Sequence, residues 1–230
     1  MEFAGTQLQT SPTIIGGKGR RVGQNISSAV MQQRREPHDS LDFFPTPLWV
    51  TRALCEYVLG GKSALEIYDV WEPACGEGHM ARALSEYFGV VHASDVHDYG
   101  YGTVQDFLMP GSRPSDSRTS PDFIITNPPF RLASQFVKRA QAISTKGCAM
   151  LTRIAFLESV GRYKELFSEY PPTIIAQFTE RVPMFKGRLD RHGSTATAYC
   201  WLTWTWNNGG SEFRWIPPCR KRLERDEDYL

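Results

Sequence analysis

Short apolar runs alternate along most of the chain with segments whose apolar residues have helical spacing. Val50, Leu54 and Val58 recur every four residues, which predicts a helix with Thr46 as N-cap and Pro47 as its first residue. Further helices are predicted from about 79, from about 132 and over 160–169, and strands over 65–72, 90–94, 123–126, 148–157, 173–182 and 197–206. Such alternation predicts an α/β fold with an open, mostly parallel sheet. No helix separates the last two strands, so we expect them to form an antiparallel hairpin.

The same pattern divides the chain into three segments. Residues 1–40 are rich in Gly, Ser, Gln and Arg without a sustained apolar period, which predicts a flexible basic arm. Residues 41–207 carry the alternating elements and are expected to fold as one domain. Residues 208–230 are expected to form a C-terminal tail.

Composition narrows the class of protein without indicating its activity. The 230 residues are 41% hydrophobic and 22% charged with a net charge of +1, as in an ordinary globular protein. Five cysteines form no Cys-x-x-Cys pair, which favours reduced thiols in a cytoplasm over a disulfide framework or a metal site. No apolar run reaches the length of a membrane span, and Met-Glu-Phe-Ala is no signal-peptide start. We therefore expect a cytoplasmic protein with neither a metal nor a membrane partner.

The segment Thr-Asn-Pro-Pro-Phe at 126–130 directly follows the apolar run 123–125. Proline fixes its own φ and disfavours helix at the residue before it, so Asn127 and Pro128 are expected to be extended with outward-pointing oxygens. Two acceptors beside the Phe130 ring suit a flat ring with an exocyclic amine, because they can take both amine hydrogens while the rings stack. A Pro-Pro turn after a buried strand is the alternative interpretation of these residues alone.

The loop Glu-Pro-Ala-Cys-Gly-Glu-Gly at 72–78 lies between the first predicted strand and its helix. Its small residues would let a ligand approach the backbone at the carboxyl edge of the sheet. Asp95 ends the next strand, where it could bind ribose hydroxyls, so this order indicates an adenosine-containing cofactor. The two glutamates of the loop would repel a pyrophosphate, which favours a cationic ligand such as S-adenosylmethionine. Asp106 and Phe107 could bind an adenine amine and ring, or form a surface turn with one core phenylalanine.

Glu-Pro-Ala-Cys-Gly-Glu-Gly-His and Asn-Pro-Pro-Phe, in this order, make the chain resemble the S-adenosylmethionine-dependent amino-methyltransferases, particularly the DNA adenine-N6 methyltransferases. The upstream Phe-Pro-Thr-Pro at 44–47 is similar to the family's cofactor-carboxylate motif, and the match covers roughly 42–206. The resemblance implies a Rossmann-like class I methyltransferase fold with a mostly parallel, seven-stranded sheet. It also implies S-adenosylmethionine as cofactor and DNA as partner.

The resemblance further implies roles for individual residues. The cofactor-binding set is Thr46 (carboxylate), Glu72, Ala74, Gly76 and Gly78 (methionine moiety), Asp95 (ribose), and Asp106 and Phe107 (adenine). The catalytic set, which binds the target amine, is Asn127, Pro128 and Phe130. Family members usually place a second aromatic residue, from the loop between the last two strands, on the other face of the flipped base. Phe185 is the candidate, with Lys186 and Arg188 for phosphates; a core residue in a solvated charged turn is the alternative.

The resemblance leaves the identity of the substrate open. Family members typically carry a target-recognition domain, whereas only 109–121 and the ends of this chain are free of predicted elements, so we expect short or relaxed sequence selectivity. The alternatives are an RNA methyltransferase (guanine N2 or adenine N6), a protein glutamine methyltransferase, and a non-catalytic subunit of a methyltransferase complex. Phe-Pro-Thr-Pro and Glu-Pro-Ala-Cys-Gly favour DNA, and the intact motifs disfavour the non-catalytic subunit. A small stand-alone modifier would suit a phage or other mobile element.

Overall fold

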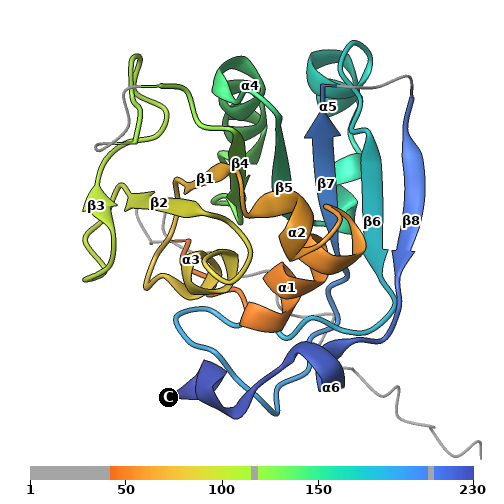
Figure 1. Cartoon of the computed structure of the whole chain (residues 1–230). Coiled ribbons are helices and arrows are strands. Elements are labelled where there is room, and N and C mark those ends of the chain that lie inside the picture. Colours follow the sequence, from red (N-terminus) through yellow and green to blue (C-terminus); the bar gives the residue numbers. More distant parts are fainter. Residues whose placement is uncertain (1–41, 115–118, 207–209) are drawn as a thin grey trace, which may run out of the picture. The chain divides into compact units, whose positions relative to one another are not determined.

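The computed structural model describes residues 42–114, 119–206 and 210–230. These residues form a sheet with helices on both faces (Figure 1). The strands are β1 (Asp69–Glu72), β2 (Val90–Asp95), β3 (Thr103–Val104), β4 (Phe123–Thr126), β5 (Gly147–Arg153), β6 (Ile174–Phe178), β7 (Tyr199–Thr205) and β8 (Glu212–Ile216). The α-helices are α1 (Leu48–Tyr57), α2 (Lys62–Leu65), α3 (His79–Leu84), α4 (Ala133–Ile143), α5 (Val160–Arg162) and α6 (Arg220–Leu223). The predicted arm, 1–40, lies outside the described residues.

The strand order is β3-β2-β1-β4-β5-β7-β6-β8, and only the pairings of β7 with β5 and β6 are antiparallel. The predicted α/β fold with a mostly parallel sheet and a C-terminal antiparallel hairpin is therefore confirmed. The sheet has eight strands rather than seven. Two strands lie outside the predicted ranges: the two-residue β3, which pairs in parallel with β2, and β8, which pairs in parallel with β6 and lies in the segment expected to be a tail, 208–230.

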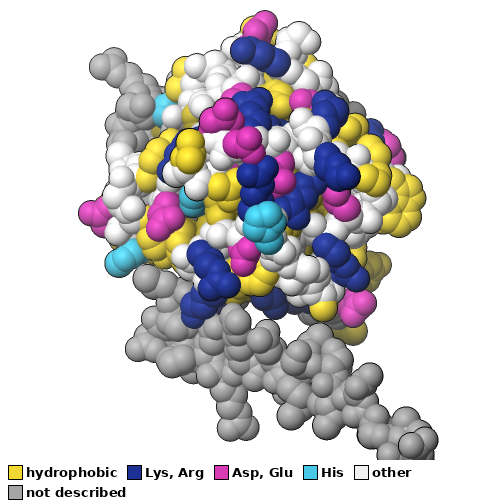
Figure 2. All heavy atoms as spheres, turned by 90° about the horizontal axis from the view of Figure 1, so that it is seen from below, with side chains coloured by type: hydrophobic (Ala, Val, Ile, Leu, Met, Phe, Trp, Pro, Cys, Tyr) yellow, Lys and Arg dark blue, Asp and Glu magenta, His cyan; other side chains and the backbone are white. Residues whose placement is uncertain are grey.

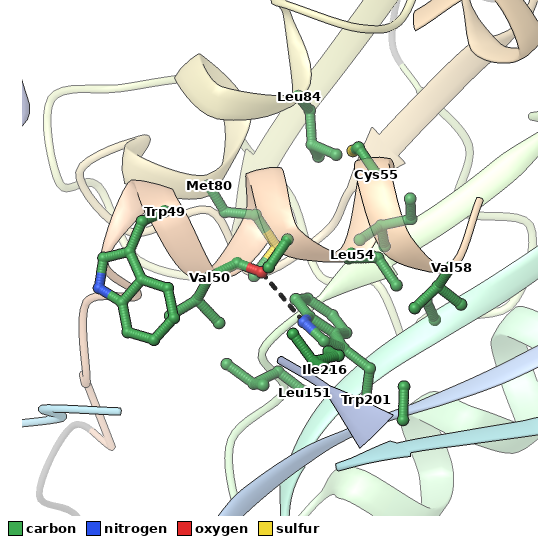
Figure 3. Packing of buried hydrophobic residues seen from close by; sticks show 14 of the residues in the cluster. Trp49, Val50, Leu54, Cys55, Val58, Met80, Leu84, Leu151, Trp201 and Ile216 are labelled. Atoms are coloured by element: carbon green, nitrogen blue, oxygen red, sulfur yellow. Dashed lines mark hydrogen bonds between the residues drawn. The ribbon is translucent and has the colours of Figure 1, made fainter. Parts of the chain in front are cut away.

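Alternating side chains of the strands supply two hydrophobic clusters, one on each face of the sheet. On β4, β5 and β7, Ile125, Leu151 and Trp201 pack with α1 and α3 in the first cluster, shown in Figure 3. There the indole Nε1 of Trp201 donates to the Val50 carbonyl at 3.1 Å, which fixes α1 on the sheet. The neighbouring positions Ile124, Met150 and Leu202 pack with α4 in the second cluster. The central strands β4, β5 and β7 are buried on both faces, as is typical of strands covered by helices on either side.

The start of α1 differs from the prediction. Its N-cap residue is Pro47, no side chain caps the helix, and α1 begins at Leu48. The hydroxyl of Thr46, expected to be the cap, instead accepts a hydrogen bond from Asn127, 81 residues away. A tertiary contact has therefore replaced the local capping contact.

Four predicted strands are shorter in the structure, among them those expected over 173–182 and 197–206, which cover Ile174–Phe178 and Tyr199–Thr205. The strand expected over 65–72 begins at Asp69, because Leu65 ends the short helix α2 and is buried there. The strand expected over 148–157 ends at Arg153, where Ile154–Leu157 turns into a 3-10 helix. In both cases the apolar run in the sequence extends beyond the strand.

Arg52 attaches the C-terminal segment to α1. Its side chain is 2% exposed, and its guanidinium donates to both carboxylate oxygens of Asp228, at 2.7 and 2.8 Å, and to the Leu223 carbonyl. It also pairs with Glu86 at 2.8 Å. A buried guanidinium needs such partners, since leaving it unpaired costs several kcal/mol. The chain beyond β8 is therefore part of the packed structure.

None of the described helices has the length and apolar character required to cross a membrane. All five cysteines are buried and form no disulfide.

Candidate functional site

A cavity of about 240 Å³ lies at the carboxyl ends of β1, β2 and β4. Glu72 and Asp95 are the last residues of their strands and Asn127 follows the last residue of β4, so the parallel sheet brings all three to one edge. The residues of the predicted site that line the cavity are Thr46, Glu72, Ala74, Asp95, Asp106, Phe107 and Asn127. This edge of the sheet is the usual place for a ligand in an open α/β fold.

Gly76 and Gly78 hold the loop after β1 but do not line this cavity. Both have positive φ, +49° and +80°, which favours glycine. A Cβ at Gly76 would come within 2.4 Å of the Phe43 ring, and one at Gly78 within 2.4 Å of the Tyr101 ring. The close approach that these glycines permit is thus to two aromatic side chains of the protein.

Glu72 brings an uncompensated carboxylate to the cavity. The residue is 2% exposed, and its Oε2 atom has no hydrogen-bond partner. Burial raises the pKa of Glu72 well above its ordinary value; a hydrogen bond from the Ala81 N–H lowers it in part, and the charge of Asp95 raises it. A cationic ligand would stabilise the ionised form, because an opposite charge offsets desolvation.

Asp95 is oriented by the backbone on either side of it. Its Oδ2 accepts from the Gly76 N–H at 2.9 Å, and its Oδ1 accepts from the His97 N–H at 3.1 Å. A carboxylate has about four acceptor positions, so two remain for a ligand hydroxyl. The backbone contacts fix where those positions point.

Asp106 and Phe107 differ in environment although they are neighbours. Asp106 is exposed and its Oδ1 accepts from the Leu108 N–H at 2.8 Å. Phe107 is 1% exposed, and its ring packs against those of Trp71 and Phe136 with centroids 5.1 and 4.9 Å away. Phe107 is therefore both a core residue and part of the cavity wall.

One end of the Asn127 side-chain amide is hydrogen-bonded within the protein and the other is not. Its Nδ2 donates to the Phe44 carbonyl at 3.0 Å and to the Thr46 hydroxyl at 3.1 Å. Because a carbonyl only accepts, the amide nitrogen must face Phe44, and this defines the position of Oδ1. Oδ1 is buried without a hydrogen-bond partner. An orphaned buried acceptor of this kind costs about 1–3 kcal/mol unless a donor from a ligand reaches it.

Two residues of Asn-Pro-Pro-Phe face a second cavity of about 180 Å³. Asn127 and Pro129 line the first cavity, whereas Pro128 and Phe130 line the second, as side chains alternate along an extended segment. The Phe130 N–H donates to the Asp42 carboxylate at 2.6 Å, which holds the end of the motif. The four-residue motif therefore separates two adjoining cavities.

The loop expected to bind the substrate lies elsewhere. Phe185, Lys186 and Arg188 are among the residues lining neither cavity. The Arg188 guanidinium lies 5.6 Å from the Phe185 ring centroid and pairs with Asp190 at 3.6 Å. The Gly187 N–H donates to the Phe43 carbonyl at 2.9 Å, so the loop is attached to the segment that lines the first cavity.

Charges of both signs cover the end of the molecule seen in Figure 2, where Lys and Arg side chains lie among Asp and Glu. Arg191, one of the basic residues of the 181–192 loop, pairs with Asp226 at 2.6 Å. Among the residues that the structure describes, no group of three or more His, Cys, Asp or Glu side chains could hold a metal ion.

Phe43 and Tyr99 are cavity residues that the sequence did not reveal. Their rings stack with centroids 4.6 Å apart and planes at 31°. Burial raises the pKa of Tyr99 to about 12, and the negative charges of Asp95 and Glu77 contribute. Phe43 directly precedes the Phe-Pro-Thr-Pro segment, and this position could have indicated that it lines the cavity. No sequence pattern marks Tyr99.

Neither the family models nor the curated proteins that were searched contain a match to this sequence. Among solved structures, the chain is similar to the modification subunit of a candidate type I restriction enzyme from Vibrio vulnificus (TM-score 0.55, 16% identity, 82% of this chain and 50% of that one). It is also similar to a candidate class I S-adenosylmethionine-dependent methyltransferase from Listeria monocytogenes (TM-score 0.53, 12% identity, 77% of this chain and 67% of that one).

A third similar structure is a candidate RNA methyltransferase from Pyrococcus horikoshii (TM-score 0.52, 17% identity, 74% of this chain and 91% of that one). The chain thus spans only half the length of the Vibrio vulnificus protein and two thirds of the Listeria monocytogenes one. At such low identities the likeness concerns the fold. The chain has the Rossmann-like fold of the class I S-adenosylmethionine-dependent methyltransferases.

Proposed function

We propose that this protein transfers a methyl group from S-adenosylmethionine to the N6 amine of adenine in DNA. The observation that carries the proposal is the buried, unpartnered Oδ1 of Asn127, held in one orientation by Phe44 and Thr46. It lies in a motif that separates two cavities, one suited to a cofactor and one beside an aromatic ring. A hydrogen-bond acceptor between a site for the methyl-donating cofactor and an aromatic stacking surface suits the transfer of a methyl group to an amine.

The residues of the first cavity fit S-adenosylmethionine. The buried carboxylate of Glu72 lacks a partner for Oε2, which suits the ammonium or sulfonium charge of this cofactor. Asp95 retains acceptor positions for ribose hydroxyls. The Thr46 hydroxyl accepts from Asn127 and still has its own hydrogen to donate to a carboxylate. Phe107 and Asp106 would receive the adenine ring and amine.

The chemistry follows from what these groups do to the acceptor nitrogen. When bound, the cofactor supplies a methyl group on a positively charged sulfur. The lone pair of adenine N6 is delocalised into the ring, so Asn127 Oδ1 and the Pro128 carbonyl would accept the two amine hydrogens and direct the lone pair at that methyl. Positioning and fixed acceptors carry the step, and no base is needed before attack, because the methylated amine loses its proton readily afterwards.

DNA is favoured over other acceptors by the Phe-Pro-Thr-Pro and Glu-Pro-Ala-Cys-Gly segments and is supported by the likeness to a restriction-enzyme modification subunit. A duplex base must leave the stack to reach Asn127, and stacking on Phe130 would offset part of that cost. Lys186 and Arg188 are proposed to contact phosphates. Phosphate contacts carry no sequence information, so we propose short or relaxed selectivity for this chain.

The test is transfer of tritiated methyl groups to separate pools of DNA, RNA and protein, followed by nucleoside and amino-acid analysis. The proposal expects label in N6-methyldeoxyadenosine with wild type and none with Asn127→Ala. Label found only in RNA nucleosides or only in glutamine would show that the substrate is RNA or protein, and the proposed methyl-transfer site would stand. Cofactor binding without transfer to any pool would favour a non-catalytic subunit.

A further inference from the structure

The second cavity has an aromatic ring paired with an arginine on each of two sides. The Arg153 guanidinium lies over the Phe130 ring, 3.9 Å from its centroid. The Arg162 guanidinium lies over the Phe156 ring, 4.8 Å from its centroid. All four residues line the cavity, together with Pro128. The cavity therefore offers two flat stacking surfaces, each already in contact with a flat cation.

The contact between Arg153 and Phe130 blocks a surface that the proposed function requires. Atoms in van der Waals contact are about 3.5–4.0 Å apart, so at 3.9 Å no further ring fits between the guanidinium and Phe130. The Phe44 ring also packs on Phe130, with centroids 5.0 Å apart. An incoming base can thus stack on the Arg153 side of Phe130 only after Arg153 has moved.

The two arginines are held very differently. Arg162 donates to the carbonyls of Phe156, Ala155 and Glu158, at 2.6, 3.2 and 2.8 Å, and is fixed to the turn after β5. Arg153 is exposed, and the residue opposite it across β5 and β7 is Tyr199. Arg162 is thus part of the wall, whereas Arg153 can leave for solvent without breaking a backbone contact.

We propose that Arg153 occupies the place of the acceptor base on Phe130 and is displaced when the base enters, with Phe156 forming the far wall of the pocket. This inference rests on the proposed function, since it takes an extrahelical nucleobase to be the ligand. It assigns Arg153 as a positioning residue that sets how readily a base is accepted. It also assigns the second aromatic surface to Phe156 instead of Phe185.

The test measures binding of an oligonucleotide taken from the nucleic acid that the transfer assay labels, with either adenine or an abasic residue at the acceptor position. The ratio of the two dissociation constants reports base engagement, because phosphate contacts contribute equally to both. Arg153→Ala should raise the preference for adenine by about 2- to 30-fold, the range expected from losing one cation–π contact. Arg153→Lys, which keeps the charge but not the flat group, should raise the ratio without weakening abasic binding.

Three comparisons decide the outcome. Lys164→Ala removes an exposed charge outside the cavity lining and should leave the ratio unchanged. Phe156→Ala should lower the ratio, and Arg153→Ala in a Phe130→Ala background should have no effect on it. A ratio that is unchanged or lower in Arg153→Ala would overturn the inference. Absence of binding to any nucleic acid would instead refute the proposed function, and the inference with it.

Discussion

Asn127 donates a hydrogen bond from Nδ2 to the Thr46 hydroxyl at 3.1 Å, across 81 residues of sequence. The bond joins the segment before α1 to the loop after β4, and so connects the proposed cofactor and acceptor motifs. The Phe44 carbonyl, which can only accept, fixes Nδ2 on this side and leaves Oδ1 as the end of the amide that lacks a partner. The two motifs therefore form one structural unit.

Asn127→Ala should abolish methyl transfer while changing S-adenosylmethionine affinity less than about threefold, because Oδ1 is assigned to the acceptor amine alone. Single-turnover transfer and calorimetry measure the two quantities. Gln135→Ala, which removes an exposed amide from α4, is the control and should match wild type. Residual turnover above a few per cent in Asn127→Ala would contradict the role of Oδ1.

Thr46→Val should lower the rate of transfer by roughly 2- to 10-fold, the worth of one hydrogen bond of about 0.5–1.5 kcal/mol. The substitution keeps the side chain's shape but removes the acceptor for Nδ2, so the amide of Asn127 becomes less firmly oriented. The rate at saturating cofactor isolates this effect from any loss of cofactor affinity. A rate equal to wild type would mean that Phe44 alone orients the amide.

Asp95→Ala should weaken S-adenosylmethionine binding by about 1.5–3 kcal/mol, as expected for hydrogen bonds to a charged group. Since Asp95 also accepts from Gly76 and His97, thermal unfolding without cofactor must be measured alongside calorimetry. Asp98→Ala removes a carboxylate that accepts only locally from Gly100 outside the cavity lining, and provides the matched control. Equal affinities in the two variants would remove Asp95 from the cofactor site.

Glu72 should make stability and cofactor binding depend on pH in a defined direction. Its pKa is raised in the folded protein above the ordinary 4.5, so the folded state holds the proton more tightly than the unfolded state. Its stabilising contribution is complete below about pH 4.5 and is lost as pH rises through the folded pKa. The melting temperature of Glu72→Gln should therefore rise relative to that of wild type as pH increases over this range.

Binding of a cationic cofactor should reverse this protonation. If the cation pairs with the ionised carboxylate of Glu72, cofactor binding releases a proton at pH values below the folded pKa. Calorimetry in buffers with different ionisation enthalpies measures the release, and Glu72→Gln should lack it. The same number of protons released by both proteins would assign the cation to another group.

Gly76→Ala should destabilise the protein by more than the roughly 1–2 kcal/mol expected for an alanine at positive φ, because its Cβ would also meet Phe43 at 2.4 Å. Gly111→Ala is the control: Gly111 has φ +82° with no atom within 4 Å of a Cβ, so it measures the strain alone. Urea unfolding gives both free energies. Adding Phe43→Ala should recover part of the difference; failure to do so would place the strain elsewhere.

The positions of the motifs were predictable because local signals mark where the strands end. Thr126 and Asp95 each end an apolar run, so the residues after β4 and at the end of β2 could be placed at the sheet edge. By contrast, β8 is a five-residue alternation, Glu-Phe-Arg-Trp-Ile, with two exposed aromatic rings. It becomes a strand through pairing with β6, which the sequence of the segment itself does not encode.

The parts of the site that escaped prediction depend on contacts between distant residues. The sequence predicts a loop at Gly76 and Gly78 whose small residues let a ligand approach the backbone, but not that Phe43 and Tyr101 cover these glycines. Nor does it reveal that Arg153, on β5, lies on Phe130, after β4. Register and rotamer decide such contacts, and composition carries little information on either.

The insertion of β7 between β5 and β6 has a consequence for how the chain reaches its native state. In the sheet, β6 is bonded only to β7 and β8, both of which follow it in sequence. During synthesis from the N-terminus, β1, β2, β4 and β5 can assemble at once, whereas β6 must wait with two open edges until Tyr199–Thr205 has emerged. Unpaired strand edges promote aggregation, so the strand order exposes the nascent chain to aggregation during this interval.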